Sequence, residues 1–327
     1  FEMPAGVRLI SHEPYDPIYT EGLLPVEEVR PCALSRIVSF CKPLSQIIWA
    51  FQLLLAADRR TVVIANGSTY FGNYVCLLNH YFFFGKKIVL FWDSHIEPRS
   101  GIKRYLARRC FLGCCLATLW SSKQVQNYCR RFRLPEKLFV FIPYKATHSK
   151  VNFRNLPVLD FAFAGGNGKR DYKTLLDAVR GTNVTLIISC TRESVLGSIE
   201  DLPNVIPLAA SEPSYSKLMA SCRFVIVPMT STGLKGGGET SFCNGMWHGK
   251  PVIAMDDISA EDYIIEGETG YIVSPGDGTA LRNRILELWD HPEKANEMGE
   301  KGRQRAQRFF TQLEGIRRLV RLACLLG

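Results

Sequence analysis

A run of glycines followed by polar residues gives the chain a stretch suited to binding an anion. Three glycines at 236–238 precede Glu239, Thr240 and Ser241, and the turn 249–251 follows after a short apolar segment. Glycines let the backbone approach a ligand closely, and Thr240 and Ser241 are residue types that cap helices. The first amides of a helix lack partners within the helix and carry the positive end of its dipole. This stretch predicts a diphosphate site; a tight loop that merely closes a βαβ unit is the alternative.

A second polar cluster follows the apolar segment 159–164. Gly165 and Gly166 form a turn there, and Lys169 and Arg170 come directly after it. If a phosphate or diphosphate leaves from this turn in a reaction, it gains negative charge in the transition state, and a positioned cation would lower the barrier. Arg170 can also donate two parallel hydrogen bonds to phosphate oxygens. We expect at least one of the two cations to contact a diphosphate; the alternative is an ordinary solvated side chain.

Three blocks of sequence, taken in order, resemble the GT-B glycosyltransferases of the large group 1 family, which includes relatives of sucrose and glycogen synthases. The blocks read FAFAGGNGKRDY at 161–172, KGGGETSFCNGMWHGKPVIA at 235–254 and EGETGYIVSPGD at 266–277. The resemblance implies two Rossmann-like domains with parallel sheets facing across a cleft. It also implies a nucleotide-sugar donor of UDP or GDP type, transfer with retention of configuration, and no metal ion or other cofactor.

The resemblance assigns roles to particular residues, with one departure from the family. Many members carry two glutamates eight positions apart in the second block, and this chain has Gly236 and Asn244 there. Glu239 is therefore considered separately: it could accept hydrogen bonds from sugar or ribose hydroxyls, or only stabilise the helix start. Asn244 could contact the ribose or be an exposed helix amide. The expected donor-binding residues are Gly165, Gly166, Lys169, Arg170, Gly237, Gly238, Glu239, Thr240, Ser241 and Asn244; Arg170 and Glu239 are also expected to be catalytic.

The acceptor side is expected in the first half of the chain. Asp93 and His95 follow the apolar segment 87–92 and would lie at a strand end facing the donor domain. Either side chain could orient or deprotonate an acceptor hydroxyl, and Asp93 is the preferred catalytic residue. The alternative for Asp93 is a turn-forming aspartate. His248, before the turn 249–251, is expected to end a helix and not to act as a catalyst.

The pattern of apolar segments predicts an α/β protein with two domains. Strands are expected at 61–65, 87–92, 115–120, 138–142, 159–164, 184–189, 205–207, 224–227, 252–254 and 271–273, with a further strand possible at 7–10. Helices are expected at 37–55, 70–84, 101–111, 123–132 and 302–326. Continuous apolar strands separated by helices indicate parallel sheets covered on both faces. We expect an acceptor domain at 1–143, a linker at 144–157, a donor domain at 158–301 and a final helix that packs back on the first domain.

The positive charge of the chain is concentrated in its first half. Residues 1–150 contain 20 Lys and Arg against 10 Asp and Glu, whereas residues 151–327 contain 20 against 21. A basic patch is expected from Lys103, Arg104 and Arg108 together with Arg130, Arg131 and Arg133. This patch could face an anionic membrane or an acceptor, which would be a sugar, a glycan or a lipid-linked molecule. A solvated helix face is the alternative, and a nucleic acid partner is not expected.

The cysteines favour a reducing compartment. Eleven are present, without paired CxxC spacing and mainly in apolar segments, so buried thiols are expected and a zinc site is not. The most apolar run, 43–57, is shorter than the roughly 20 residues that cross a bilayer. We therefore expect a cytoplasmic protein that could associate peripherally with a membrane. Because the chain begins with Phe1 and not methionine, we expect native residues upstream of it.

Two other classes of function are compatible with the same residues. A sugar-nucleotide epimerase or hydrolase would convert the donor without an acceptor. A non-catalytic nucleotide-sugar binding protein would bind without turnover, which the incomplete glutamate pair makes worth testing.

Overall fold

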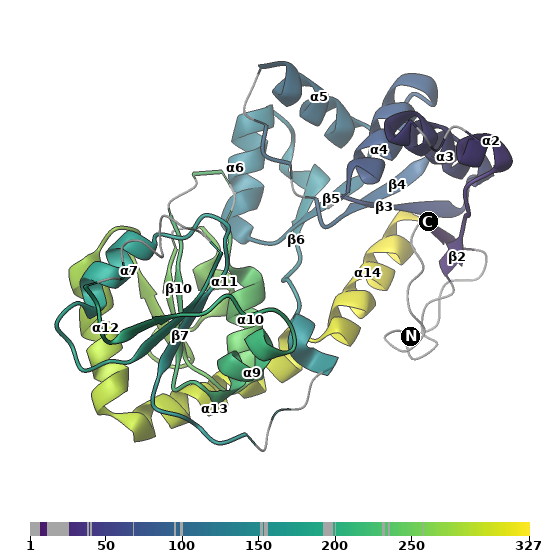
Figure 1. Ribbon diagram of the computed structural model, residues 1–327. Coiled ribbons are helices and arrows are strands. Elements are labelled where there is room, and N and C mark those ends of the chain that lie inside the picture. The colour runs from purple at the N-terminus through teal and green to yellow at the C-terminus, as the bar shows by residue number, and fades with distance from the viewer. Residues whose placement is uncertain are drawn as a thin grey trace. The chain divides into compact units, whose positions relative to one another are not determined.

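The chain folds into two units, each built on a parallel sheet (Figure 1). The computed structural model describes residues 7–11, 26–37, 39, 41–67, 69–94, 96–98, 101–150, 153, 156–191, 199, 201–230, 233–234, 236–256 and 258–327. Unit 1 comprises Phe1–Ile142 and Leu313–Gly327, and unit 2 comprises Pro143–Gln312. The last helix of the chain therefore belongs to the first unit.

Unit 1 contains a six-stranded sheet in the order β2-β1-β3-β4-β5-β6, with every pair parallel. Because the strand order reverses beside β1 and β3, ligands are expected outside the carboxyl ends of these strands. The strands are β1 Arg8–Ser11, β2 Val26–Glu28, β3 Thr61–Asn66, β4 Ile88–Trp92, β5 Leu116–Leu119 and β6 Phe139–Phe141. The helices are α2 Ala33–Ile37, α3 Lys42–Ala56, α4 Tyr70–Phe82, α5 Gly101–Leu112, α6 Ser122–Phe132, the 3₁₀ turn η1 Glu136–Leu138 and α14 Gln312–Leu326.

Unit 2 contains a second parallel sheet, in the order β12-β11-β10-β7-β8-β9. This is the doubly wound Rossmann order, with its switch point between β7 and β10. The strands are β7 Ala162–Gly165, β8 Leu186–Ser189, β9 Val205–Pro207, β10 Val225–Pro228, β11 Val252–Met255 and β12 Gly270–Val273. The helices are η2 Thr147–Lys150, α7 Tyr172–Val179, α9 Ser214–Ser221, α10 Glu239–Trp247, α11 Ala260–Tyr263, α12 Gly278–Asp290 and α13 Pro292–Phe309.

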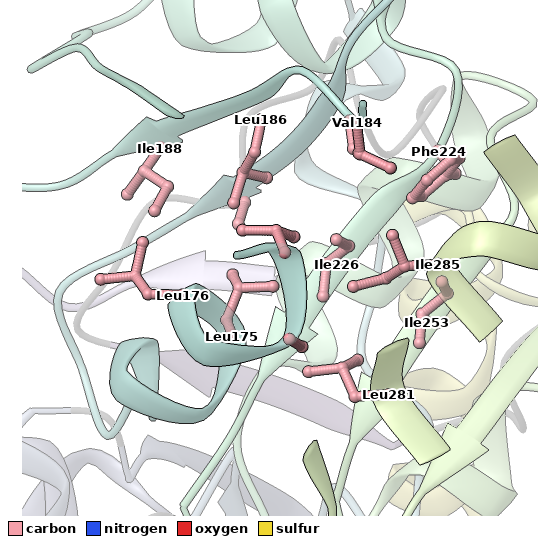
Figure 2. Packing of buried hydrophobic residues seen from close by; sticks show 14 of the residues in the cluster. Leu175, Leu176, Val184, Leu186, Ile188, Phe224, Ile226, Ile253, Leu281 and Ile285 are labelled. Atoms are coloured by element: carbon pink, nitrogen blue, oxygen red, sulfur yellow. The ribbon is translucent and has the colours of Figure 1, made fainter. Parts of the chain in front are cut away.

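The strands of unit 2 are apolar on both faces because helices cover both faces of the sheet. Ile226 of β10 and Ile253 of β11 point into a cluster with side chains of α7 and α12, which Figure 2 shows from close by. Their neighbours Val225 and Val252 belong to a second cluster, with Phe242 of α10. This alternation explains why the strands read as continuous apolar runs. The expected α/β class with two Rossmann-like units is confirmed.

Several expected elements have other boundaries. The helix expected at 302–326 is wrong as a single element: α13 begins at Pro292, and the chain bends at Phe310 before α14. Phe310 is 2% exposed and its carbonyl accepts a hydrogen bond from Ala146 N at 2.7 Å, so the helix ends where this residue enters the core of unit 2. The helix expected at 37–55 is α3, which begins only at Lys42 with Pro43 in its first turn, and the separate helix α2 ends at Ile37. The strand β2 was not predicted.

The two ends of unit 2 are fixed by packing. Residues 144–150, expected to lie in the linker, contact this unit: Tyr144 N donates to Tyr263 Oη at 2.8 Å, and Ala146 is fully buried. After α13, helix α14 buries Leu319 and Ala323 against the sheet of unit 1. Within the residues described, no helix is long and apolar enough to cross a membrane.

Candidate nucleotide-sugar site

The turn after β7 is shaped by two glycines. A Cβ on Gly165 would collide with the hydroxyl of Tyr215 in α9, so only glycine fits beside that ring. Gly166 has φ +110°, a conformation that side chains rarely adopt. Its carbonyl accepts a hydrogen bond from Tyr172 Oη at 2.7 Å. The sequence therefore forms an open, fixed turn at the switch point of the sheet.

Arg170 is held at this turn by three elements of unit 2. Its Nε donates to Gly165 O at 3.1 Å, one Nη donates to Gly168 O at 3.0 Å, and the other donates to Ser241 Oγ at 3.2 Å. The guanidinium also contacts Met229 Sδ. The backbones of Arg170 and Met229 pair in an isolated antiparallel β-bridge just after β10. Burial lowers the pKa of Arg170, but a guanidinium is not deprotonated in proteins. The arginine is therefore a partly buried cation between β7, β10 and α10.

Lys169 shapes the same turn through its backbone. It has φ 50°, and its carbonyl accepts a hydrogen bond from Thr230 N at 2.9 Å. Asp171, the next residue but one, caps α7 by accepting from Thr174 N at 3.0 Å. Asp171 is thus a helix cap, and Arg170 does not need it as an ion-pair partner.

The glycines at 236–238 lead directly into α10. Gly238 is the N-cap residue, with φ +88°, and a Cβ there would lie 2.8 Å from Val227 Cγ1. A Cβ on Gly237 would lie 2.5 Å from Met229 Cε. The expectation that Thr240 or Ser241 caps the helix is wrong, because α10 begins at Glu239 and its cap makes no side-chain hydrogen bond.

The first turn of α10 presents polar side chains to Arg170. Ser241, 8% exposed, joins Arg170 to Tyr215, whose hydroxyl is hydrogen-bonded to the Ser241 side chain. Burial raises the pKa of Tyr215. Thr240 is exposed beside it. Tyr215 is a member of this cluster that sequence reasoning missed, since nothing in its local sequence marks it and only the packing of α9 brings it here.

Glu239 is buried at the start of α10. It is 5% exposed, and its Oε1 lies 2.7 Å from where a Cβ on Gly236 would be. That Cβ would also collide with Ser259 Oγ. The negative charge of Glu239 acts to raise the pKa of Arg170, against the larger effect of burial. Gly236, which stands where many members of the family carry a glutamate, has no side chain and thus leaves room for the carboxylate of Glu239.

Asn244 holds a different part of the unit. Its Oδ1 accepts from His148 N at 3.1 Å, and its Nδ2 donates to Thr147 Oγ1 at 2.9 Å. It is 2% exposed, so the alternative of an exposed helix amide is wrong. Both ends of the amide bind the chain, and Asn244 attaches η2 to α10.

In unit 1, Asp93 follows β4 in a left-handed conformation, with φ 52°. Its Oδ1 accepts a hydrogen bond from Trp120 Nε1 at 3.0 Å, and its backbone N donates to Thr118 Oγ1 at 2.8 Å. His95 lies outside the described residues. The aspartate is therefore fixed at the carboxyl end of its strand, as expected.

A hollow of about 780 Å³ opens at the carboxyl end of the neighbouring strand β3. It is lined by Lys42, Pro43, Gln46, Gly67, Thr69, Tyr70, Asn73 and Tyr74. A Cβ on Gly67 would lie 2.6 Å from the Cα of Ser94, so the hollow borders the loop that carries Asp93. The switch-point rule places ligands at this edge of unit 1.

A metal site is not apparent in the part of the chain that the structure describes. No group of three or more His, Cys, Asp or Glu side chains there is arranged to hold an ion.

Comparison with known proteins finds similarity within unit 2. A model of the glycosyl transferases group 1 family matches residues 204–305. The D-rhamnosyltransferase WbpZ of Pseudomonas aeruginosa is 39% identical over 72 residues, which are 22% of this chain and only 19% of that relative.

Solved structures resemble the chain over nearly its whole length. HepE of Anabaena in complex with UDP has a TM-score of 0.67 at 16% identity, covering 94% of this chain and 88% of HepE. Sucrose-phosphate synthase of Thermosynechococcus elongatus has a TM-score of 0.66 at 17% identity, covering 92% of this chain and 83% of that one. At such identities the likeness shows the fold alone. The chain therefore has the GT-B fold, and within it residues 204–305 match the glycosyl transferases group 1.

Proposed function

We propose that the protein is a glycosyltransferase that moves a sugar from a nucleotide-sugar donor to an acceptor hydroxyl. The observation that carries this proposal is the cluster at the switch point of unit 2. There the glycine turn after β7, the guanidinium of Arg170 and the amino-terminal end of α10 come together. A cation and a helix amino terminus at the carboxyl ends of Rossmann strands form an anion site.

In this proposal the donor diphosphate binds between Arg170 and the first amides of α10. The bond between the sugar C1 and the diphosphate oxygen breaks, and a bond forms between C1 and the acceptor oxygen. The acceptor proton passes to the departing diphosphate. Arg170 and the helix amides stabilise the charge that the diphosphate gains. Retention of configuration and independence of metal ions are proposed from the resemblance to the family. UDP is the first nucleotide to test, since HepE was solved with UDP.

Glu239 is proposed to bind the transferred sugar. A carboxylate beside a diphosphate would be repelled, so it must face hydroxyl groups that donate to it. Its burial beside Gly236 keeps it within the glycine loop, at the end of α10 where the diphosphate would lie. Asn244, in contrast, is already bonded to Thr147 and His148, which favours a structural role over a ribose contact.

The acceptor is proposed to enter the hollow of unit 1 beside β3. Its lining is rich in hydroxyl and amide side chains, which suit a sugar or glycan, and Tyr70 at its edge is 78% exposed. Asp93 lies on the loop that Gly67 touches and could orient the acceptor hydroxyl. A lipid-linked acceptor is included in this proposal.

We also propose that unit 1 associates peripherally with anionic membranes. Phe84, just after α4, is 80% exposed and has φ 54°, a strained conformation for an aromatic residue. Ile102 and Tyr105 of α5 are 76% and 50% exposed. Beside them, Arg104, Arg108, Arg131 and Arg133 line a hollow of about 480 Å³ with Gly101, Tyr105 and Phe132. Exposed aromatic side chains next to cations suit the interface of an anionic bilayer.

The donor is identified by measuring thermal unfolding with UDP, GDP, ADP and their sugars. A nucleotide sugar that binds the folded state should raise the unfolding midpoint, and product should form only when an acceptor is added. Conversion of the donor alone would favour an epimerase or hydrolase. Binding without turnover on any acceptor would favour a non-catalytic binding protein.

A further inference from the structure

A second cavity of unit 2 lies away from the proposed donor site. It has a volume of about 450 Å³ and is lined in part by Phe153, His248, Lys250, Asn296, Glu300 and Arg303. Lys250 precedes β11, so the cavity lies at the amino end of this strand, whereas Arg170 and Gly238 lie at carboxyl ends. The size falls within the range of about 300–1,000 Å³ that small-molecule sites have.

Lys250 is the unusual residue of this cavity. It is only 6% exposed, and no hydrogen bond or ion pair joins its ammonium group to a described residue. Burial lowers the pKa of Lys250, and the neighbouring thiol of Cys222 is uncharged near neutral pH because burial raises its pKa to about 12. A cation that is largely removed from water and is bonded to no described residue is unfavourable. An anion supplied from outside the chain would remove that penalty.

The other charges of the cavity do not neutralise Lys250. Glu300 is bonded twice by Arg303, at 2.8 and 2.7 Å, and accepts from Gln304 at 3.3 Å. His248 is uncharged near neutral pH, because burial lowers its pKa to about 3. It contacts His148 Nδ1 at 3.0 Å through its Nε2. The sequence between Glu136 and Asp160 contains no acidic residue either.

The rest of the lining suits a small polar molecule that carries the anion. Asn296 and Arg303, both on α13, offer hydrogen-bond donors. The ring of Phe153 stacks on that of His248, with centroids 6.2 Å apart and planes inclined by 30°, and so forms an apolar wall. We propose that this cavity binds the phosphate group of a small molecule through Lys250, at a site separate from that of the nucleotide sugar.

The test compares the unmodified protein with Lys250→Met and with Lys217→Met, which removes an exposed lysine of the same unit. Inorganic phosphate and ribose 5-phosphate are titrated at constant ionic strength, with and without UDP. The unfolding midpoint of the unmodified protein and of Lys217→Met should rise with either probe, whether or not UDP is present. Lys250→Met should begin at an equal or higher midpoint, because it lacks the unpaired charge, and should not respond when UDP occupies the proposed donor site. An equal response of Lys250→Met would overturn the proposal.

The two probes distinguish the source of the phosphate. A response to ribose 5-phosphate at lower concentration than to inorganic phosphate assigns the site to a phosphate ester, and equal responses assign it to the free ion. Acylation of lysines, followed by mass spectrometry, tests the site without any substitution. Phosphate should slow the labelling of Lys250 and leave that of Lys217 unchanged. Labelling of Lys250 at the same rate with saturating phosphate would also contradict the proposal. Because neither readout requires turnover, failure here is distinguishable from failure of the proposed transferase activity.

Discussion

Arg170 is the residue on which the proposed chemistry depends most. Its three hydrogen bonds to Gly165, Gly168 and Ser241 fix the guanidinium before any ligand arrives. A fixed charge needs no reorganisation when the diphosphate departs. Arg170→Ala should therefore reduce kcat/KM by about 10²-fold, and Arg170→Lys, which keeps the charge but not the planar group, by less. Rates are compared after thermal unfolding has shown that each variant folds. A rate unchanged in Arg170→Ala would mean that the helix amides or Lys169 suffice.

Glu239 is tested by a substitution that keeps its shape. Glu239→Gln retains one acceptor oxygen and loses the charge, and a weakened or lost hydrogen bond to a buried hydroxyl costs roughly 1–3 kcal/mol. If the carboxylate binds the transferred sugar, the nucleotide sugar should lose about tenfold or more in affinity or kcat/KM, while the nucleoside diphosphate binds as before. Equal weakening of both ligands would assign Glu239 to the ribose. Affinities and kcat/KM values like those of the unmodified protein would show that Glu239 only stabilises the start of α10.

At the scale of elements, the proposed donor site depends on how closely β7, α9 and α10 approach one another. Gly165 has no room for a side chain because the Tyr215 ring lies against it, whereas a Cβ on Gly168 would meet no atom within 4 Å. Gly165→Ala should push Tyr215 away from Ser241 and destabilise the protein by roughly 1–3 kcal/mol, as overpacking usually does. Gly168→Ala is the matched control and should unfold at nearly the unmodified temperature. Equal midpoints for the two variants would show that α9 adjusts freely, so that this contact does not define the site.

At the scale of the whole molecule, the asymmetric charge allows the proposed association with a membrane to be tested. Binding to vesicles that contain an anionic phospholipid should fall steeply with salt, because each cation near the surface contributes about 1 kcal/mol that is screened. Arg104→Glu with Arg108→Glu should weaken binding at low salt. Phe84→Ser should weaken it at all salt concentrations, because it removes apolar contact and not charge. Sedimentation with vesicles measures both, and neutral vesicles serve as the control. Absence of binding at low salt would remove the membrane from the proposal.

Much of the architecture follows from local patterns. Continuous apolar runs determine buried parallel strands because both faces of such a sheet are covered, and ten strands expected from these runs occur within a few residues of their observed positions. The glycines at 165–166 and 236–238 marked the two loops of the candidate site because their backbone conformations and close contacts exclude side chains. The breaks at Pro43 and Phe310 were missed, since an amphipathic pattern continues across both.

Only the tertiary structure decided which side chains meet. The residue type at 239 could not show that Glu239 is buried beside Gly236, because this contact depends on the missing Cβ of the glycine. The residue type at 244 could not show that Asn244 is bonded to Thr147 and His148, because these residues lie far away in the chain. The same holds for Tyr215, which reaches Ser241 through the packing of α9. It holds also for Lys250, which has no carboxylate partner among the residues that the structure describes because of how distant segments pack around it. Local sequence determines the backbone path, and burial of distant segments against one another determines which polar groups are left to bind a ligand.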